Sequence, residues 1–292
     1  MRKWGKAAIF LVLAATSGGR AFAQGGGAEA IREPGSSTQS KSPSAEAVPR
    51  IDERTALMVG ARRLKLGVLF FEYGVTEHLS VGTQPVGWAV RAFAPVLAPN
   101  LNVKFQFVDR DPVWLSAMVA GYYGNISNGK VSGEVLIAPI SLFASVRPVR
   151  RLYLHAEGTY VFARAFGDGD LSQAQVGGTL VARAVQTQLM AEVRVLQWLS
   201  LIALGRGQPY TSPIRASGTS QIDPYTTASV DAELAPKIEH PWVIAGGVAL
   251  LFPHVRLTVG AGYGTYFVPG MDVPLQQRGF VPDGSLAVLF TP

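Results

Sequence analysis

The sequence predicts an all-β protein, an antiparallel transmembrane β-barrel of about 12 strands, with roughly 10 to 14 possible. Three observations predict it: strands with one apolar and one polar face, connections of sorted length, and an export leader. Of the 292 residues, 48% are hydrophobic and only 16% are charged, as expected for a protein partly solvated by lipid. A secreted soluble β-sandwich is the weaker alternative, because alternation alone does not say which face lies inside.

The N-terminus has the three parts of a secretory signal peptide. Residues 1–6 are basic, residues 7–16 are apolar, and Ala21-Phe22-Ala23 is a small-x-small cleavage site. The apolar run is shorter than the roughly 20 residues that a membrane-spanning helix needs. We therefore expect residues 1–23 to be a cleaved signal peptide. Residues 24–52, rich in Gly, Ser, Ala and Pro, are expected to be a disordered linker, and residues 53–292 to form the barrel.

Net charge and cysteine content exclude several classes of protein. The formal charge of +6 falls to +2 once the four basic residues of the leader are removed. No basic run with interleaved aromatics remains, so a nucleic-acid partner is not expected. The absence of cysteine excludes disulfides, cysteine nucleophiles and thiolate metal sites, and also excludes a lipoprotein anchored through cysteine.

Alternation is clearest in residues 151–166, RLYLHAEGTYVFARAF. Leu154, Tyr160 and Phe162 share one face, and His155 and Glu157 share the other. In a membrane barrel the apolar face meets lipid and the polar face lines the lumen, so we expect that orientation here. The same pattern recurs along the chain, and the polar faces supply these candidate lumen-lining residues: Lys104, Gln106, His155, Glu157, Gln188, Glu192, Arg194, Asp231, Glu233 and Arg256.

The connections differ in length. Short turns begin the stretches 76–82, 149–158, 196–205 and 253–262, whereas the longer polar or Gly-rich stretches are 124–131, 167–179, 207–225 and 268–283. Short turns at one end and long loops at the other are typical of outer-membrane barrels. Thirteen segments read as strands, an odd number, so we expect that either 54–60 or 225–235 does not span the membrane.

The stretches FFEYGVTEHLSVGTQPVGW and LAPNLNVKFQF resemble a group of uncharacterised outer-membrane β-barrel-like proteins of Gram-negative bacteria. The most characteristic pieces are YGVTEHLSVGT and APNLNVKF, and the resemblance covers roughly residues 54–166. It implies an outer-membrane location and a barrel architecture. It implies no biochemical activity.

Candidate catalytic and metal sites are weak. Ser145 could be a cross-strand neighbour of His155, but a structural polar histidine beside Glu157 is the favoured interpretation, and no G-x-S-x-G motif is present. His155 and Glu157 could supply two metal ligands, too few for a convincing site. The acidic run GDGD at 167–170 lacks the ligand spacing of a calcium loop. We therefore expect no enzymatic activity, no metal and no cofactor.

Two functions are compatible with these observations. The first is a narrow channel or transport barrel for small or polar solutes, and the second is a plugged structural or surface-interaction barrel without transport activity. The expected partners are outer-membrane lipid, solutes in the lumen, and the export and barrel-assembly machinery. The expected location is the outer membrane of a Gram-negative bacterium, after cleavage of the signal peptide.

Overall fold

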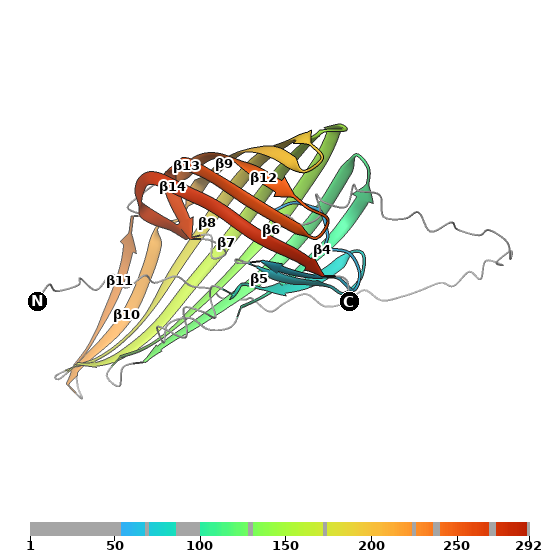
Figure 1. The fold of residues 1–292 in the computed structure, drawn as a ribbon. Helices are drawn as coiled ribbons and strands as arrows, with labels where there is room; N and C mark the ends of the chain where they lie inside the picture. Colours follow the sequence, from blue (N-terminus) through green and yellow to red (C-terminus); the bar gives the residue numbers. More distant parts are fainter. Residues whose placement is uncertain are drawn as a thin grey trace, which may run out of the picture.

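The described part of the chain is almost entirely β-structure (Figure 1). The computed structural model describes residues 54–67, 70–85, 100–127, 131–171, 174–223, 226–235, 240–268 and 273–290. The expected signal peptide and linker, residues 1–52, lie outside these residues. The strands are β1 Leu64–Gly67, β2 Phe71–Gly74, β3 Leu79–Thr83, β4 Asn100–Arg110, β5 Val113–Ser127, β6 Val131–Val149, β7 Leu152–Leu171, β8 Ala174–Leu196, β9 Leu199–Thr211, β10 Ile214–Asp223, β11 Thr226–Leu234, β12 Trp242–Leu251, β13 Val255–Val268 and β14 Val273–Phe290.

The strands close into a ring of 12, which confirms the predicted antiparallel barrel. Neighbouring strands follow the chain from β1 to β9, then continue through β12, β13 and β14, and β14 pairs with β1. Two pairings between strands that are distant in the sequence complete the ring: β9 with β12, and β14 with β1. Closure matters because a membrane barrel can leave no backbone hydrogen-bonding groups unpaired against lipid.

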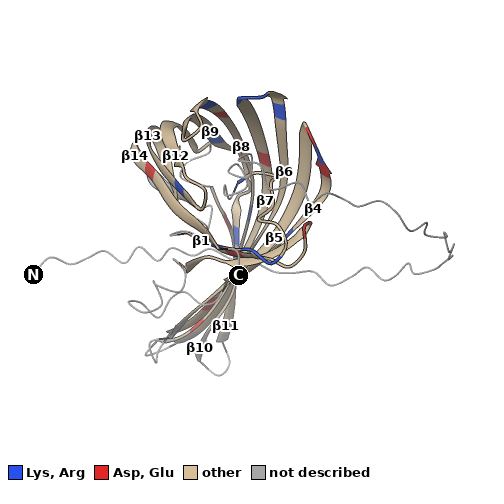
Figure 2. Cartoon of the chain, turned by 45° about the vertical axis from the view of Figure 1, so that its right-hand side comes forward, with Lys and Arg blue, Asp and Glu red and all other residues tan. Residues whose placement is uncertain are grey.

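The two halves of strand β8 have different partners on the side away from β7. Its second half, Ala184 to Leu196, pairs with β9 and belongs to the ring. Its first half, Gln175 to Val181, pairs with β10, and β10 pairs with β11. The hairpin β10–β11 therefore continues the wall of β6, β7 and β8 beyond the ring, and in Figure 2 it projects away from the ring.

Side chains alternate across the wall as the sequence predicts. On β7, Leu154 and Tyr160 are each 40% exposed on the outside, while His155 and Glu157 are buried on the inside. Strand β4 shows the same division, with exposed Phe105 between buried neighbours. Within the described residues, no helix combines the length and the apolar character needed to cross a membrane.

The two rims of the barrel carry different connections. One rim, called the turn rim here, carries the short connections 75–78, 111–112, 150–151, 197–198 and 252–254 and the end of β14. The other, called the loop rim, carries the longer connections 84–99 and 212–241, together with the shorter ones 68–70, 128–130, 172–173 and 269–272. The turns predicted from the sequence at 150–151, 197–198 and 252–254 all fall on the turn rim. The predicted difference in length holds only in part. The stretches 124–131, 167–179 and 268–283, expected to be long loops, contain connections of only two to four residues, because the strands on either side extend farther than predicted, and 207–225 contains the end of β9 and all of β10.

Two expected strands are not part of the ring. Residues 54–60 form no strand, and residues 226–234 form β11, which lies outside the ring. We expected one of the two segments to be non-spanning, and the structure removes both. The remaining difference in count comes from the N-terminal region, where residues 63–74 form two four-residue strands, β1 and β2, instead of one long strand.

The candidate lumen site

A segment outside the strands, Arg54 to Gly60, lies inside the barrel against the inner side chains of the wall and is called the plug here. Thr55, Ala56, Leu57, Met58 and Val59 are at most 5% exposed, although they belong to no strand. The plug leads to β1, whose first residue pairs with Phe290 at the turn rim. It therefore occupies the half of the lumen nearest the turn rim.

Inward side chains satisfy the hydrogen-bonding groups of the plug backbone. The ammonium group of Lys104 donates to the carbonyl oxygens of Thr55 at 2.6 Å and Leu57 at 3.0 Å. The side-chain amide of Gln106 donates to the carbonyl of Ala56 at 2.9 Å. Without such partners, a buried segment outside a sheet would lose the free energy of its unmade hydrogen bonds. Lys104 and Gln106 thus serve as the partners that a neighbouring strand would otherwise supply.

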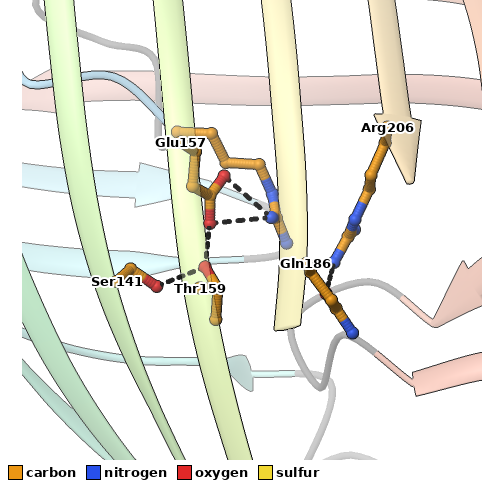
Figure 3. A network of polar contacts seen from close by, with 6 residues as sticks. Ser141, Glu157, Thr159, Gln186 and Arg206 are labelled. Atoms are coloured by element: carbon orange, nitrogen blue, oxygen red, sulfur yellow. Dashed lines mark hydrogen bonds and ion pairs between the residues drawn. The ribbon is translucent and has the colours of Figure 1, made fainter. Parts of the chain in front are cut away.

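A second group of contacts fixes the deep end of the plug (Figure 3). The guanidinium of Arg54 approaches a carboxylate oxygen of Glu157 to 3.1 Å, and the Glu157 side chain is 4% exposed. The hydroxyl of Thr159 donates to the same carboxylate at 2.8 Å, and Ser141 lies 2.7 Å from Thr159. Glu157 is therefore held by groups from both the plug and the wall.

The structure brings Ser145 and His155 together, as the cross-strand alternative allowed. The two residues pair directly between β6 and β7, and Ser145 Oγ lies 2.8 Å from His155 Nδ1. The backbone N–H of Ala56 donates to the same Oγ at 2.9 Å. Ser145 is fully buried under the plug. The plug therefore covers the oxygen of Ser145.

Two buried ion pairs complete the interior. Lys65 on β1 contacts Glu72 on β2 at 2.8 Å, and both side chains are at most 3% exposed. Arg256 on β13 contacts Glu192 on β8 at 2.9 Å, and each of these side chains is 3% exposed. Strands β9 and β12 lie between β8 and β13 in the ring, so the second pair joins two wall strands that are not neighbours. It bridges this part of the wall from the lumen side.

A cavity of about 360 Å³ remains in the lumen beside the plug. Its polar lining includes Arg54, Glu157, Gln188, Arg206 and Arg256. Its apolar lining includes Met118, Tyr122, Phe143, Met190, Ile202, Leu204, Val243 and Phe267. Tyr122, Val243 and Phe267 come from the loop-rim ends of their strands, so the cavity extends from the plug toward the loop rim.

The candidate lumen residues fall into two groups. Lys104, Gln106, His155, Glu157, Gln188, Glu192 and Arg256 are buried on the inner face, and Arg194 is half-buried there. Asp231 and Glu233 do not line the lumen, which corrects our expectation. They lie on β11 outside the ring, where both are exposed and Glu233 pairs with Arg215 at 2.9 Å. The alternation of polar and apolar residues around Asp231 and Glu233 does indicate a strand. That strand belongs to the projecting hairpin and not to the ring.

The sequence analysis missed several residues of the interior: Arg54, Lys65, Glu72 and Ser141. The alternation in LKLG and FEYG was a usable signal for Lys65 and Glu72, but each strand is only four residues long. No local pattern marks Arg54 as a lumen residue. Among the described residues, no group of three His, Asp or Glu side chains could hold a metal ion.

An apolar exterior around a polar interior defines this protein as a membrane-spanning β-barrel of the outer-membrane type. Contact with membrane lipid follows from that exterior. No protein-family model matches the chain, and no curated protein matches it.

Solved structures with a similar fold are outer-membrane barrels. The copper transporter OprC shares 12% identity at a TM-score of 0.42, over 78% of this chain and 41% of its own. The translocator domain of the autotransporter NalP from Neisseria meningitidis shares 9% identity at a TM-score of 0.41, and the match covers 78% of this chain and 85% of that domain. The toluene transporter TodX of P. putida shares 9% identity at a TM-score of 0.46, and the match covers 82% of this chain and 70% of TodX. The chain thus spans less than half the length of OprC. These likenesses concern the fold alone.

Proposed function

We propose that this protein is a transport barrel for small or polar solutes, whose passage is closed by its own N-terminal plug. The observation that carries the proposal is the burial of residues 55–59 in the lumen beside a cavity that extends toward the loop rim. A barrel of 12 strands is narrow, so one extended segment is enough to obstruct it. Movement of the plug would join the cavity to the turn rim.

The hydrogen bonds of the plug support a segment that can be displaced. Lys104, Gln106 and Ser145 bind it through side chains, and no strand ladder holds it. Each bond can be exchanged for a bond to water once the lumen is hydrated. The mixed charge of the lining, with Arg206 and Arg256 near Glu157, predicts weak ion selectivity.

The same burial favours a second candidate function, a plugged barrel without transport that serves as a structural or surface-interaction protein. The two functions differ in one property, which is whether the plug leaves the lumen. Neither requires enzymatic activity, and we propose that Ser145 and His155 are structural in both.

A reversible crosslink between plug and wall tests the proposal. The chain has no cysteine, so Ala56→Cys with Ser145→Cys introduces a single cysteine pair. The two residues are in contact in the native barrel, where the backbone nitrogen of Ala56 lies 2.9 Å from Ser145 Oγ. We expect conductance in planar bilayers to disappear on oxidation and to return on reduction. The control pair is Ala56→Cys with Leu142→Cys, because Leu142 faces outward and is 60% exposed. Absence of conductance in both redox states, from heat-modifiable folded protein, would favour the plugged structural barrel.

We also propose that the chain is exported and cleaved after Ala23, and that the barrel-assembly machinery inserts it into the outer membrane. The supports are the leader of residues 1–23 and the closed barrel. N-terminal sequencing of protein from isolated outer membranes should begin at Gln24. An uncleaved N-terminus at Met1 would overturn this part of the proposal.

A further inference from the structure

The outer face of β7 and β8 changes from apolar to cationic at the same height. On β7 the outward positions from Leu152 to Phe162 carry no charge, and the next one is Arg164. On β8 the outward positions from Val195 to Val185 carry no charge, and the next one is Arg183. At about 3.3 Å per residue and a tilt of about 40°, Leu152 to Phe162 covers about 25 Å of the membrane normal. That is the height of the apolar band, so both arginines lie at its edge.

The strand register places the two arginines beside each other. Phe162 pairs with Arg183, and Arg164 pairs with Val181, so the arginines are diagonal neighbours on one face. Such positions are roughly 7 to 8 Å apart, within reach of long side chains. The edge is on the loop-rim side of the band, because β7 runs from the turn rim toward Leu171.

Aromatic rings support both guanidinium groups. Arg164 lies 3.9 Å from the centre of the Phe166 ring, and Arg183 lies 5.5 Å from that of Phe162. A ring face stabilises the cation but leaves the N–H groups free to donate at the edge of the guanidinium plane. The rings thus position the arginines without satisfying them.

Among the described residues, the two arginines have no anionic partner. In the part of the chain that the structure describes, neither guanidinium forms an ion pair, and Nε of Arg164 is buried without a hydrogen-bond partner. Arg215, in the same row of the sheet, contrasts with them because it pairs with Glu233 at 2.9 Å. Glu134 pairs in register with Phe166 and is therefore also a diagonal neighbour of Arg164, but no ion pair joins these two described side chains. An unpaired cationic group at a membrane edge calls for an external anion.

We propose that Arg164 and Arg183 form a binding site for the phosphate group of a lipid in the outer leaflet. Two guanidinium forks can donate to one phosphate, and the phosphate level of the leaflet begins where the apolar band ends. Phe162 would pack against the upper part of the acyl chains, and Phe166, one row farther toward the loop rim, would lie at the level of the headgroup. The site lies on the outer wall and is independent of any passage through the lumen.

The test compares the Arg164→Gln/Arg183→Gln variant with wild type in phosphatidylcholine nanodiscs containing diphosphoryl lipid A. Native mass spectrometry measures the lipid A bound per barrel. We expect roughly a tenfold loss of affinity in the double variant. The charge-matched control is Arg150→Gln/Arg151→Gln, two exposed residues of the turn rim, and it should bind as wild type does. Arg164→Lys/Arg183→Lys should fall between, because lysine lacks the planar fork.

Three outcomes would overturn the proposal: wild-type binding by the double variant, an equal loss in the turn-rim control, or equal binding of dephosphorylated lipid A. Displacement of lipid A by millimolar inorganic phosphate would show a site for free anions instead. If the double variant fails to give a heat-modifiable band, Arg183→Gln alone replaces it. Arg183 is exposed on the surface, so its loss should leave folding intact.

Discussion

The ammonium group of Lys104 lies 2.6 Å from the carbonyl oxygen of Thr55, and this contact joins the barrel wall to a segment 49 residues earlier in the chain. The same group donates to Leu57 and lies 5.2 Å from the centre of the Phe143 ring. A charged side chain is normally costly to bury, and here two carbonyls and a ring face compensate for its lost hydration. Lys104 is thus the main polar anchor of the plug.

Replacement of Lys104 by Met should release the plug. The variant keeps the volume of the side chain but loses two charge-assisted hydrogen bonds, together worth about 3 kcal/mol. We expect proteolytic cleavage within residues 54–60 of the folded barrel, monitored by mass spectrometry. Gln106→Leu removes one neutral bond and should have a smaller effect, of about 1 kcal/mol. Equal protection of wild type and Lys104→Met would contradict the anchoring role.

The ion pair between Glu192 and Arg256 should be costly to break from one side only. Glu192→Leu leaves a buried guanidinium without its carboxylate, and we expect a loss of stability of about 3 to 5 kcal/mol. Glu192→Leu with Arg256→Met removes both charges, and should restore most of that loss. The measurement is urea unfolding in detergent micelles, followed by tryptophan fluorescence. A double variant less stable than the single one would show that the pair is favourable in itself.

Adjacent residues of β8 should tolerate a charge very differently. Leu189 is 66% exposed toward lipid, whereas Gln188 is 5% exposed toward the lumen. Leu189→Arg should cost about 2 to 4 kcal/mol near the middle of the membrane, because lipid cannot solvate a guanidinium. Gln188→Arg is the matched control and should fold, since it faces a polar cavity. Unfolding in lipid vesicles measures both, and a greater loss in Gln188→Arg would reverse the assigned orientation of β8.

Ser145 should not react as a nucleophile in the plugged barrel. Its oxygen is buried and already binds Ala56 N–H and His155. We expect no labelling of wild type by a fluorophosphonate probe, with trypsin as the positive control. Ser145→Ala should instead lower stability by about 1 to 3 kcal/mol, because the buried Ala56 N–H loses its acceptor. Labelling of wild type that disappears in Ser145→Ala would assign the serine a catalytic role.

Much of the wall could be predicted from local pattern. The alternation along β4, β7 and β8 identifies the strands and their two faces, since a period of two needs only neighbouring residues. Strand ends were harder to predict. The GDGD run at 167–170 lies within β7 and not in a loop, because pairing with β8 continues past the apolar band up to Leu171.

The position of β11 shows why a lumen residue cannot be assigned by alternation alone. The segment TTASVDAEL alternates as well as β4 does, yet both of its faces are exposed for most of its length. Pro213 lies two residues after the end of β9 and cannot donate to a strand ladder, a local sign that β9 ends near it. The choice of β10 as the next partner of β8 depends on pairings far apart in the chain. Alternation alone therefore predicted Asp231 and Glu233 as lumen residues, although β11 lies outside the ring.

The sequence by itself determined most strands of the ring, which of their faces is apolar, and hence that the chain makes a membrane barrel. Those properties depend on residues one or two positions apart. The sequence did not identify β10, which lies in the stretch 207–225 that was expected to be a loop. Only the tertiary structure decided that residues 54–60 lie in the lumen, that β9 pairs with β12 to close the ring, and that Arg164 and Arg183 meet on the outer wall. The reason is physical. An apolar run such as ALMV is buried equally well in a wall or inside it, and the choice depends on distant side chains, such as Lys104 and Gln106, that satisfy its backbone.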